Sequence, residues 1–540
     1  MTTSSPNQPS LWQQSTTRRF LKWLFSWRTA RGALISVACV VTLWALFCAE
    51  ENVRGKHAWN RYRQQLEAQG EQLDLQAFIP KPVPDDQNFA ATPVVQSWFV
   101  RSNSTFANLW QRDTYALAQN HIDGPQADRD RSTRQFFDLV AWNEAVDVVR
   151  AGKMTGWQRF SSGKLDPASR AGAVPSVLEG LKTNEAVFAE LRAASQRPYS
   201  RYPLVYDLEN PWAILLPHLN NVRSVVRRLQ LKACAELAAA QSQNALEDVK
   251  LMLYLTDSVK DEPFLISYLV RIACVQHTIQ PVWEGLAEHR WSEAQLHELQ
   301  ERLQQYNFVA DLKHPLDTER AAAILTAELI RKKGLGYLSD LQESGSPSSN
   351  DRNRTIARLL GLLVPYGWCY QEQLNYCRLF ELGFGGTIDG ARRQVSPSRV
   401  SSNQEALNAN FRASAGGTGI RKLLRHQVLA GMLLPALGRV TLRAATAQVS
   451  ADQAAIACAL ERYRLTNGQY PETLDALVPQ FISELPHDVI GGAPYMYRRT
   501  DNGSFLLWSV GWNEKDDGGV PGKTLFDEKD GDWVWTYPEK

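Results

Sequence analysis

Cysteine is sparse in this sequence, and its spacing excludes the usual thiolate sites. The 540 residues include seven cysteines, and no two of them have the CxxC spacing of zinc or thioredoxin-like sites. Cys369 and Cys377 would lie about 12 Å apart along one continuous helix, too far apart to form a disulfide. A bridge between Cys234 and Cys274 is left open, with buried free thiols as the default.

Net charge is also nearly absent. Lys plus Arg total 59 and Asp plus Glu total 57, for a formal net charge of +2 at pH 7. The two signs are interspersed, so no long-range field would attract nucleic acid or a strongly charged substrate. At this length the chain should hold two or more folded units, since single cores stop growing at about 250 to 300 residues.

Motifs that would mark an enzyme are missing. Residues 297–301 (HELQE) begin like a zinc-protease motif, but Glu301 stands where the second histidine belongs. No GxSxG segment marks a nucleophile elbow. His218, His277 and His426 lie in apolar helical contexts, and we expect them to be core residues. The sequence therefore names no catalytic residue.

One long uncharged segment is present. Residues 32–49 would cover about 27 Å as a helix, just enough for the hydrocarbon core of a bilayer. The charged residues before this segment are all basic, whereas charged residues of both signs follow it. The positive-inside rule therefore predicts a cytoplasmic tail (1–31), a transmembrane helix (32–49) and a remainder of the chain outside the cytoplasm. A cleaved signal peptide is the alternative, but Phe47 does not suit a cleavage site. Residues 17–22 (TRRFLK) resemble a twin-arginine signal with one residue missing from its spacing, and an ordinary basic flank is favoured.

Residues 50–89 predict a helix followed by a proline-rich stalk. Residues 59–70 have a helical pattern, whereas residues 79–86 (IPKPVPDD) carry prolines at alternating positions. Each proline fixes its own φ and pushes the preceding residue out of the helical region. We expect an extended, stiff connector between the membrane and a folded body.

Residues 90–440 predict a large helical domain outside the cytoplasm. Apolar residues recur at helical spacing over residues 222–240 and 245–259. A further helix, over residues 263–286, begins with proline, and Ser292 opens the next with a capping-box spacing. Consecutive helices favour stacked hairpins or a solenoid-like array, although no fixed-period repeat is found. Loops are predicted at residues 343–350, 383–408 and 413–419.

The C-terminal residues resemble a known module. They contain, in order, ALERYRL at 459–465, TNGQYPETL at 466–474, LPHD at 485–488, GGAPY at 491–495 and LWSVG at 507–511. These segments resemble the globular domain of the major pseudopilin of type II secretion systems. The resemblance implies a small α+β pseudopilin-like domain at residues 441–540 of a mainly α chain. A capping-box spacing at Ser450 predicts where its helix starts and favours a head that folds alone.

The chain departs from that family before the module. A pseudopilin begins with a cleaved leader and Phe-Thr-Leu-x-Glu, and its membrane helix runs directly into the head. Here the apolar run at residues 428–437 is interrupted by Pro435 and is too short to span a bilayer. We expect a head that is separated from any polymerising stem.

An acidic loop precedes the aromatic strand at residues 533–535. Oxygen-rich loops suit calcium, which takes six to eight oxygen ligands. The pseudopilin resemblance implies calcium at the matching loop, held by backbone carbonyls and aspartates, although this loop is longer than the family's usual one. A solvated acidic turn is the alternative. The candidate metal ligands are Asp516, Asp517, Asp527, Asp530 and Asp532.

The middle region resembles large bacterial membrane proteins that join a similar helical body to the same module, a resemblance that brings no activity with it. The segments that carry it are FIP at 78–80, VPD at 83–85, LED at 246–248, DEP at 261–263 and LVRI at 269–272. We expect a single-pass protein of the bacterial inner membrane, with a cytoplasmic N-terminus and a periplasmic bulk. It would contact the bilayer through residues 32–49 and bind envelope proteins as a scaffold, without catalysis. The alternatives are an accessory component of a type II secretion or pilus-like machine, and an envelope hydrolase with an unrecognised site.

Overall fold

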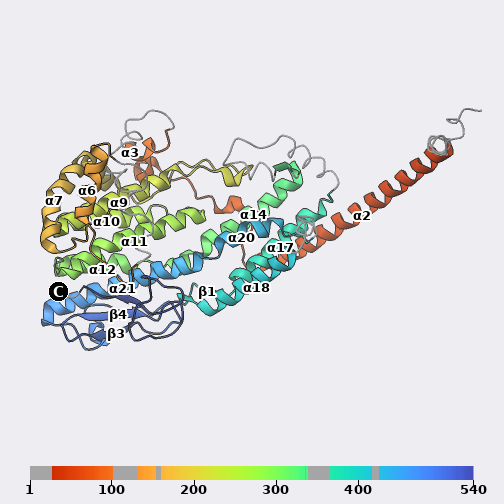
Figure 1. Cartoon of the computed structure of the whole chain (residues 1–540). Helices are drawn as coiled ribbons and strands as arrows, with labels where there is room; N and C mark the ends of the chain where they lie inside the picture. The colour runs from red at the N-terminus through yellow and green to blue at the C-terminus, as the bar shows by residue number, and fades with distance from the viewer. Residues whose placement is uncertain are drawn as a thin grey trace, which may run out of the picture. The chain divides into compact units, whose positions relative to one another are not determined.

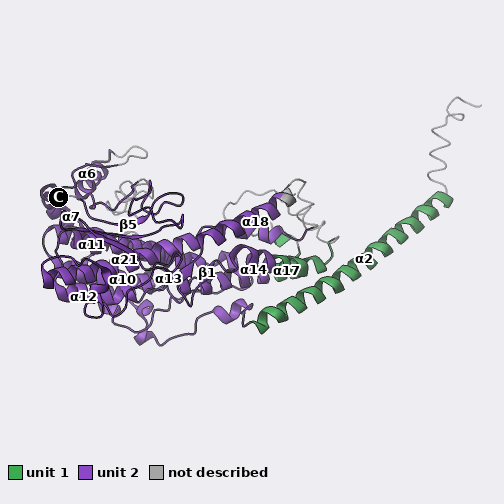
Figure 2. Cartoon of the chain, turned by 90° about the horizontal axis from the view of Figure 1, so that it is seen from below, with its two compact units in different colours: residues 1–69, 327–375 green, residues 70–326, 376–540 purple. Residues whose placement is uncertain are grey.

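The computed structural model describes residues 27–100, 131–153, 160–334, 336–337, 364–415 and 425–538. This part of the chain is mainly helical, with a small C-terminal sheet (Figure 1), so the mainly α fold class is confirmed. By their internal contacts the residues form two compact units (Figure 2), one of residues 1–69 and 327–375 and one of residues 70–326 and 376–540. The predicted domain boundaries remain predictions.

The first unit is built on one long helix, α2 (Trp27–Ala68). The apolar part of this helix is long enough to cross a membrane, and none of it is buried inside the protein. The helix predicted at residues 59–70 is the continuation of this same helix. An N-terminal apolar helix of this kind is compatible with a transmembrane helix.

A second element of this unit packs closely on α2. The backbone N–H of Gly367, at the start of α17 (Gly367–Phe384), donates to Asn52 Oδ1 at 2.6 Å. The last turn of α14 (Lys313–Lys333) also contacts α17, because Arg331 lies over the ring of Tyr370 at 5.5 Å. The unit is therefore assembled from segments that are far apart in the sequence.

The second unit begins with the predicted connector, which is not helical over residues 79–84. Short 3₁₀ turns flank it: η1 (Leu75–Phe78), η2 (Asp85–Gln87) and η3 (Phe89–Ala91). The connector lies against the body rather than free of it, because Phe89 is fully buried and its N–H donates to Tyr199 O at 2.8 Å.

The body consists of helices, and the predicted ones are found. The helices predicted at residues 222–240, 245–259 and 263–286 correspond to α9, α10 and α11, whose ends differ from the predicted ends by one to five residues. Both hydrogen bonds of the capping box at Ser292 are formed. The described helices not yet given bounds are α3 (Pro93–Ser97), α6 (Leu139–Arg150), α7 (Pro167–Leu181), η4 (Lys182–Asn184), α8 (Glu185–Ala194), η5 (Pro211–Ala213), α9 (Pro217–Ala238), α10 (Ser242–Asp257), α11 (Leu265–Ala287), α12 (Glu293–Gln304), α13 (Phe308–Asp311), α18 (Pro397–Ala415), α20 (Val428–Leu437), α21 (Val440–Asn467) and η6 (Leu474–Leu477).

The loop predicted at residues 383–408 is wrong over its second half. Helix α18 begins at Pro397, where the missing N–H of proline costs little. A short antiparallel pair, β1 (Ile388–Asp389) and β2 (Gln394–Val395), precedes it. The loop predicted at residues 343–350 lies outside the described residues. Residues 413–415 of the last predicted loop belong to α18, so this part of the prediction is wrong, and residues 416–419 lie outside the described residues.

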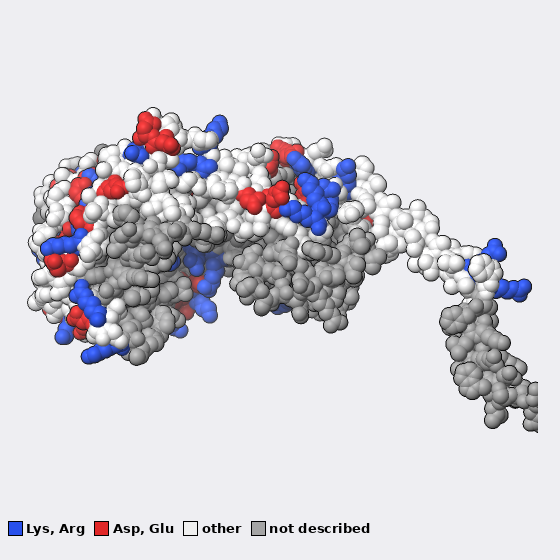
Figure 3. All heavy atoms as spheres, turned by 90° about the horizontal axis from the view of Figure 1, so that it is seen from above, with Lys and Arg blue, Asp and Glu red and all other residues white. Residues whose placement is uncertain are grey.

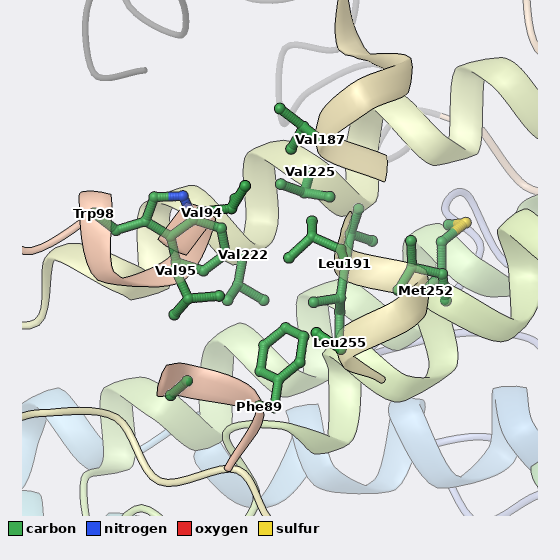
Figure 4. Close-up of a cluster of buried hydrophobic side chains, with 14 of the residues drawn as sticks. Phe89, Val94, Val95, Trp98, Val187, Leu191, Val222, Val225, Met252 and Leu255 are labelled. Carbon is green, nitrogen blue, oxygen red and sulfur yellow. The ribbon is translucent and has the colours of Figure 1, made fainter. Parts of the chain in front are cut away.

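A hydrophobic core joins the start of the body to its helical hairpins. Figure 4 shows Phe89 next to Leu255 of α10, and Val94 and Val95 of α3 next to Val222 of α9; all belong to one buried cluster. Complete burial of such a side chain stabilises the fold by about 1.5 to 3 kcal/mol. This cluster fixes how α8, α9 and α10 pack together.

Helix α21 is the central element of the C-terminal region. One side of it packs on α11, α12 and α13, and another on the antiparallel sheet β3-β4-β5. Gln448 Oε1 accepts the N–H of Phe308 at 2.7 Å, and Gln453 Nε2 donates to Trp533 O at 2.7 Å, so polar side chains tie the helix to both neighbours. The strands are β3 (Met496–Arg499), β4 (Phe505–Ser509) and β5 (Trp533–Trp535).

The helix start predicted at Ser450 is wrong. Helix α21 begins at Val440 and passes through Ser450, which is fully buried. The hydroxyl of Ser450 lies 3.0 Å from the donating Nε2 of Gln276 on α11, so it serves contact between helices and not a cap. The stretch Val428–Asn467 also has the length and composition of a membrane span, but 44% of its window is buried inside the protein.

Candidate functional site

The structure brings three of the five predicted calcium ligands together. Asp532 is buried, and its two carboxylate oxygens accept the N–H groups of Asp517 (3.2 Å) and Gly519 (2.7 Å). Asp516 Oδ1 accepts from Trp508 Nε1 at 2.9 Å. Burial, together with the nearby charges of Asp516 and Asp517, raises the pKa of Asp532.

The other two predicted ligands form a separate turn. Asp527 Oδ1 accepts the N–H groups of Lys529 (2.8 Å) and Asp530 (3.2 Å), and its Oδ2 accepts that of Lys523 (3.0 Å). Burial opposes ionisation of Asp527, but these backbone donors outweigh it and lower the pKa. Asp530 is exposed. Within the described ranges no group of three or more His, Cys, Asp and Glu side chains is placed to hold a metal ion.

A close pair of carboxylates lies between α9 and α10. Lys232 Nζ donates to Glu236 Oε1 at 2.7 Å and to Asp248 Oδ2 at 2.9 Å, and Arg192 also bonds Asp248. Burial, and then the charge of Asp248, raise the pKa of Glu236 to about 8. Paired acids can serve as a general acid and base, but these two are buried and balanced by two cations. Their arrangement is that of an internal ion network.

A histidine, a carboxylate and a hydroxyl also meet inside the body. His218 Nε2 lies 2.7 Å from Glu262 Oε1, and Ser267 donates to the other carboxylate oxygen. In a nucleophilic triad the imidazole stands between the hydroxyl and the acid, whereas here the carboxylate is in the middle. His218 is fully buried and stacks on Tyr202, with ring centroids 4.2 Å apart, so its predicted core position is confirmed.

Of the other two histidines predicted as helical core residues, His277 lies on α11 and is half-buried, whereas the prediction for His426 is wrong: it is half-buried in a turn before α20, with a φ of 52°. His277 Nδ1 lies 2.9 Å from Gln230 Oε1, and burial lowers its pKa to about 3. His297 is exposed and pairs with Glu301 at 3.4 Å, as a solvated helix face would. None of the seven cysteines, all of which lie within the described residues, forms a disulfide, and Cys234 and Cys274 are buried.

An apolar cavity of about 290 Å³ opens within the second unit. We call it the Glu319 cavity, because Glu319 alone carries a charge among the described residues that line it. Its walls come from the connector, from the extended segment at residues 206–216, from the start of α11 and from α14. The lining residues are Leu75, Ile79, Tyr206, Leu208, Pro211, Trp212, Ile214, Leu216, Pro263, Phe264, Ile266, Thr318, Glu319 and Ala322.

A second cavity, of about 420 Å³, is more polar. Lys81 and Arg201 line it together with Asp257 and Asp261, so it presents both signs of charge. Asp257 is already engaged, since its Oδ1 accepts from Arg271 Nη2 at 2.9 Å. Sequence reasoning missed both cavities, because each is assembled from segments more than a hundred residues apart.

The comparisons with known proteins add no functional assignment. No family model, curated protein or solved structure matches this chain. The geometry of the described residues therefore carries the functional argument.

Proposed function

We propose that this protein is a membrane-anchored scaffold or interaction protein of the bacterial envelope, and that it binds partners and performs no catalysis. The observation that carries the proposal is the surface of α2. Side chains such as Leu34, Val40 and Leu43 are 65–67% exposed. Each would gain about 1.5 to 3 kcal/mol by leaving water, and a bilayer removes all of them from water at once.

The charges along α2 support the proposed orientation. Arg28 and Arg31 stand before the uncharged stretch, and Glu50 and Arg54 after it form an ion pair at 3.6 Å. Figure 3 shows α2 as an uncharged stretch with basic side chains at its start. The positive-inside rule then leaves the N-terminus in the cytoplasm and the body in the periplasm.

We propose binding rather than catalysis because the close acidic side chains of the helical body are already paired with other side chains. The pair Glu236 and Asp248 is neutralised by Lys232 and Arg192, and the carboxylate of Glu262 bonds both His218 and Ser267. On the face shown in Figure 3, acidic and basic side chains lie next to one another. Cavities without strong charge suit partners held by shape and apolar contact.

For the C-terminal region we propose a pseudopilin-like head. A long helix packed on a three-stranded antiparallel sheet, with motif residues such as Tyr470 and Trp508 in its core, supports this proposal. Such a head also favours the second candidate function, an accessory component of a type II secretion or pilus-like machine. We propose calcium at this acidic loop on the strength of the pseudopilin resemblance, and Asp516, Asp517 and Asp532 are the predicted ligands that lie near one another there.

Site-specific photo-crosslinking in intact membranes tests the interaction role. A photoreactive residue would replace Ile266, at the Glu319 cavity, or Tyr199, at the polar cavity; both are about half exposed. Glu179, whose side chain is 70% exposed on α7, is the control position. We expect a discrete adduct from a cavity position and none from Glu179. Equal labelling at all three positions, or no adduct at either cavity, would contradict the proposal.

A further inference from the structure

The Glu319 cavity combines apolar walls with one carboxyl group. Thr318, Glu319 and Ala322 of α14 form one wall, and Phe264 and Ile266 at the start of α11 form another. A dry cavity of about 150 Å³ accommodates benzene, and this one is about 290 Å³. It therefore has room for a molecule of roughly ten to twelve non-hydrogen atoms.

The other polar groups of the lining are already paired within the protein. The hydroxyl of Thr318 donates to His314 O at 2.9 Å, and Trp212 Nε1 donates to Thr326 Oγ1 at 2.7 Å. The hydroxyl of Tyr206 accepts from Arg201 Nη1 at 2.9 Å. Thr318 and Trp212 therefore have no free donor for a ligand, and the Tyr206 hydroxyl has an acceptor bond to a cation.

Glu319 is different, because its carboxylate retains free acceptor capacity. It accepts the backbone N–H of Leu265 at the start of α11, whereas an ionised carboxylate offers about four acceptor sites. Burial raises the pKa of Glu319 to about 7, against the opposing effect of that N–H. An apolar site that holds one carboxylate and no cation gains most from a ligand that supplies the positive charge.

The rim of the cavity is apolar as well. Ile266, which lines the cavity, is 50% exposed. A ligand whose apolar body extends past the cavity would cover this side chain. The rim thus selects a ligand that is apolar along its length and charged at one end.

We infer that the Glu319 cavity is a binding site for an apolar primary amine, whose ammonium group pairs with the Glu319 carboxylate while its hydrocarbon body fills the cavity. This inference goes beyond the proposed scaffold function and does not depend on it. The ammonium would donate to the carboxylate oxygens that Leu265 leaves free. The same chemistry occurs in small alkylamines and at the amino terminus of an apolar peptide.

The pairing makes binding depend on pH. An ammonium ligand needs ionised Glu319, so its affinity should rise between pH 6 and pH 8. Among the neighbouring titratable groups, Tyr206 and Tyr376 on α17 stay neutral in this range because burial raises their pKa values. Burial lowers the pKa of His314 at the start of α14, which favours its neutral form.

Titration calorimetry on the full chain in nanodiscs tests the site. The probes are 4-phenylbutylamine and the alcohol of the same length, 4-phenylbutanol. We expect the amine to bind at least tenfold more tightly than the alcohol at pH 8, and the E319Q variant to lose that preference. E328Q, at an exposed carboxylate of the same helix, is the matched control and should behave as wild type.

A cavity-filling variant and a pair of peptide probes complete the test. Ala322→Phe should fill the cavity and abolish binding of both probes, and an apolar tripeptide amide with a free or acetylated amino terminus distinguishes a peptide from a small amine. If a variant does not fold, the wild-type pH dependence decides alone: amine affinity should rise severalfold from pH 6 to pH 8, and alcohol affinity should not. Equal affinity of amine and alcohol, or an amine affinity unchanged in folded E319Q, overturns the inference.

Discussion

Gly55 of α2 and Gly367 of α17 lie back to back, with no room for a side chain on either. A Cβ atom on Gly55 would meet the backbone of Gly367, and one on Gly367 would meet the backbone of Glu51 and Asn52. Because the obstacles are backbone atoms, a side chain could enter only by separating the two segments. This contact holds α17 to the part of α2 that directly follows the proposed membrane span.

A first prediction follows from that contact. Gly55→Ala should destabilise the protein by about 1 to 3 kcal/mol, because overpacking forces the backbone apart. Gly172 of α7 is the control, since a Cβ there meets nothing within 4 Å; Gly172→Ala should stabilise by about 0.5 to 1 kcal/mol through helix propensity. Denaturant unfolding in detergent measures both changes. Equal effects of the two substitutions would show that the contact between Gly55 and Gly367 is not tight.

The second prediction concerns the buried ion pair of Arg170 and Glu284. Their side chains are 1% and 0% exposed, and Arg170 also bonds Glu288 at 2.7 Å. Arg170→Met should cost about 3 to 5 kcal/mol, because Glu284 then remains buried without its cation. Adding Glu284→Met should recover much of the loss. A double-mutant cycle on unfolding free energy measures this, and strictly additive losses would contradict the pairing.

The third prediction is a pH dependence set by Glu461. Burial opposes its ionisation, but hydrogen bonds from Arg464, His289 and Tyr470 outweigh burial and lower the pKa of Glu461 to about 2. A folded pKa below the unfolded value gives stability that is complete above about pH 4.5 and is lost as the pH falls toward 2. The full contribution is about 3 kcal/mol.

Comparing wild type with E461Q isolates this contribution. The stability difference between the two proteins should shrink as the pH falls from about 5 to about 3. Urea unfolding at each pH provides the measurement. A difference that is the same at pH 3 and pH 7 would mean that the hydrogen bonds do not favour the ionised form of Glu461.

The fourth prediction is that calcium stabilises the chain through its acidic loop. At free calcium one hundred times the dissociation constant, mass action adds about 2.7 kcal/mol. Asp516→Asn and Asp517→Asn should remove most of this gain, whereas Asp501→Asn, at an exposed turn between β3 and β4, should keep it. Asp532 is unsuitable for this test, because its oxygens hold two backbone N–H groups. Identical melting curves in chelator and in millimolar calcium would reject the metal site.

The sequence predicts local features of this fold better than assembled ones. The capping box at Ser292 involves residues three apart, and the helices around it follow from apolar residues at helical spacing. By contrast, the start of α21 was wrongly predicted at Ser450 because its hydroxyl bonds Gln276, a partner that the local pattern does not contain. Helix α18 was missed because its serines and nearby glycines are typical of loops.

The candidate sites were predictable to different degrees. The acidic loop could be found because its carboxylates are close in sequence, but which of them come together depends on the backbone, and Asp527 and Asp530 form their own turn. The Glu319 cavity could not be found in this way. Its walls come from residues as distant as Leu75 and Ala322, and Glu319 differs from other helical glutamates only by what surrounds it.

A fifth prediction is that residues 440–540 need the helices of the second unit in order to fold. The body contributes Gln300, whose Nε2 donates to Phe481 O at 2.9 Å, and Trp283, whose Nε1 donates to Thr536 O at 3.0 Å. A fragment of residues 440–540 would expose the side of α21 that α11 and α12 cover, so it should melt without cooperativity. The full chain under the same calorimetric conditions is the control. A sharp, reversible transition of the fragment would support a head that folds alone.

The orientation of α2 in a membrane tests the central claim most directly. A reporter enzyme that is active only outside the cytoplasm would be fused after Lys540, and in a second strain before Arg18, with membrane association of the chain checked by alkaline extraction. The account predicts an active reporter after Lys540, a silent one before Arg18, and a chain that stays with the membrane. A silent reporter after Lys540 together with an active one before Arg18, or a chain released in soluble form, would contradict it.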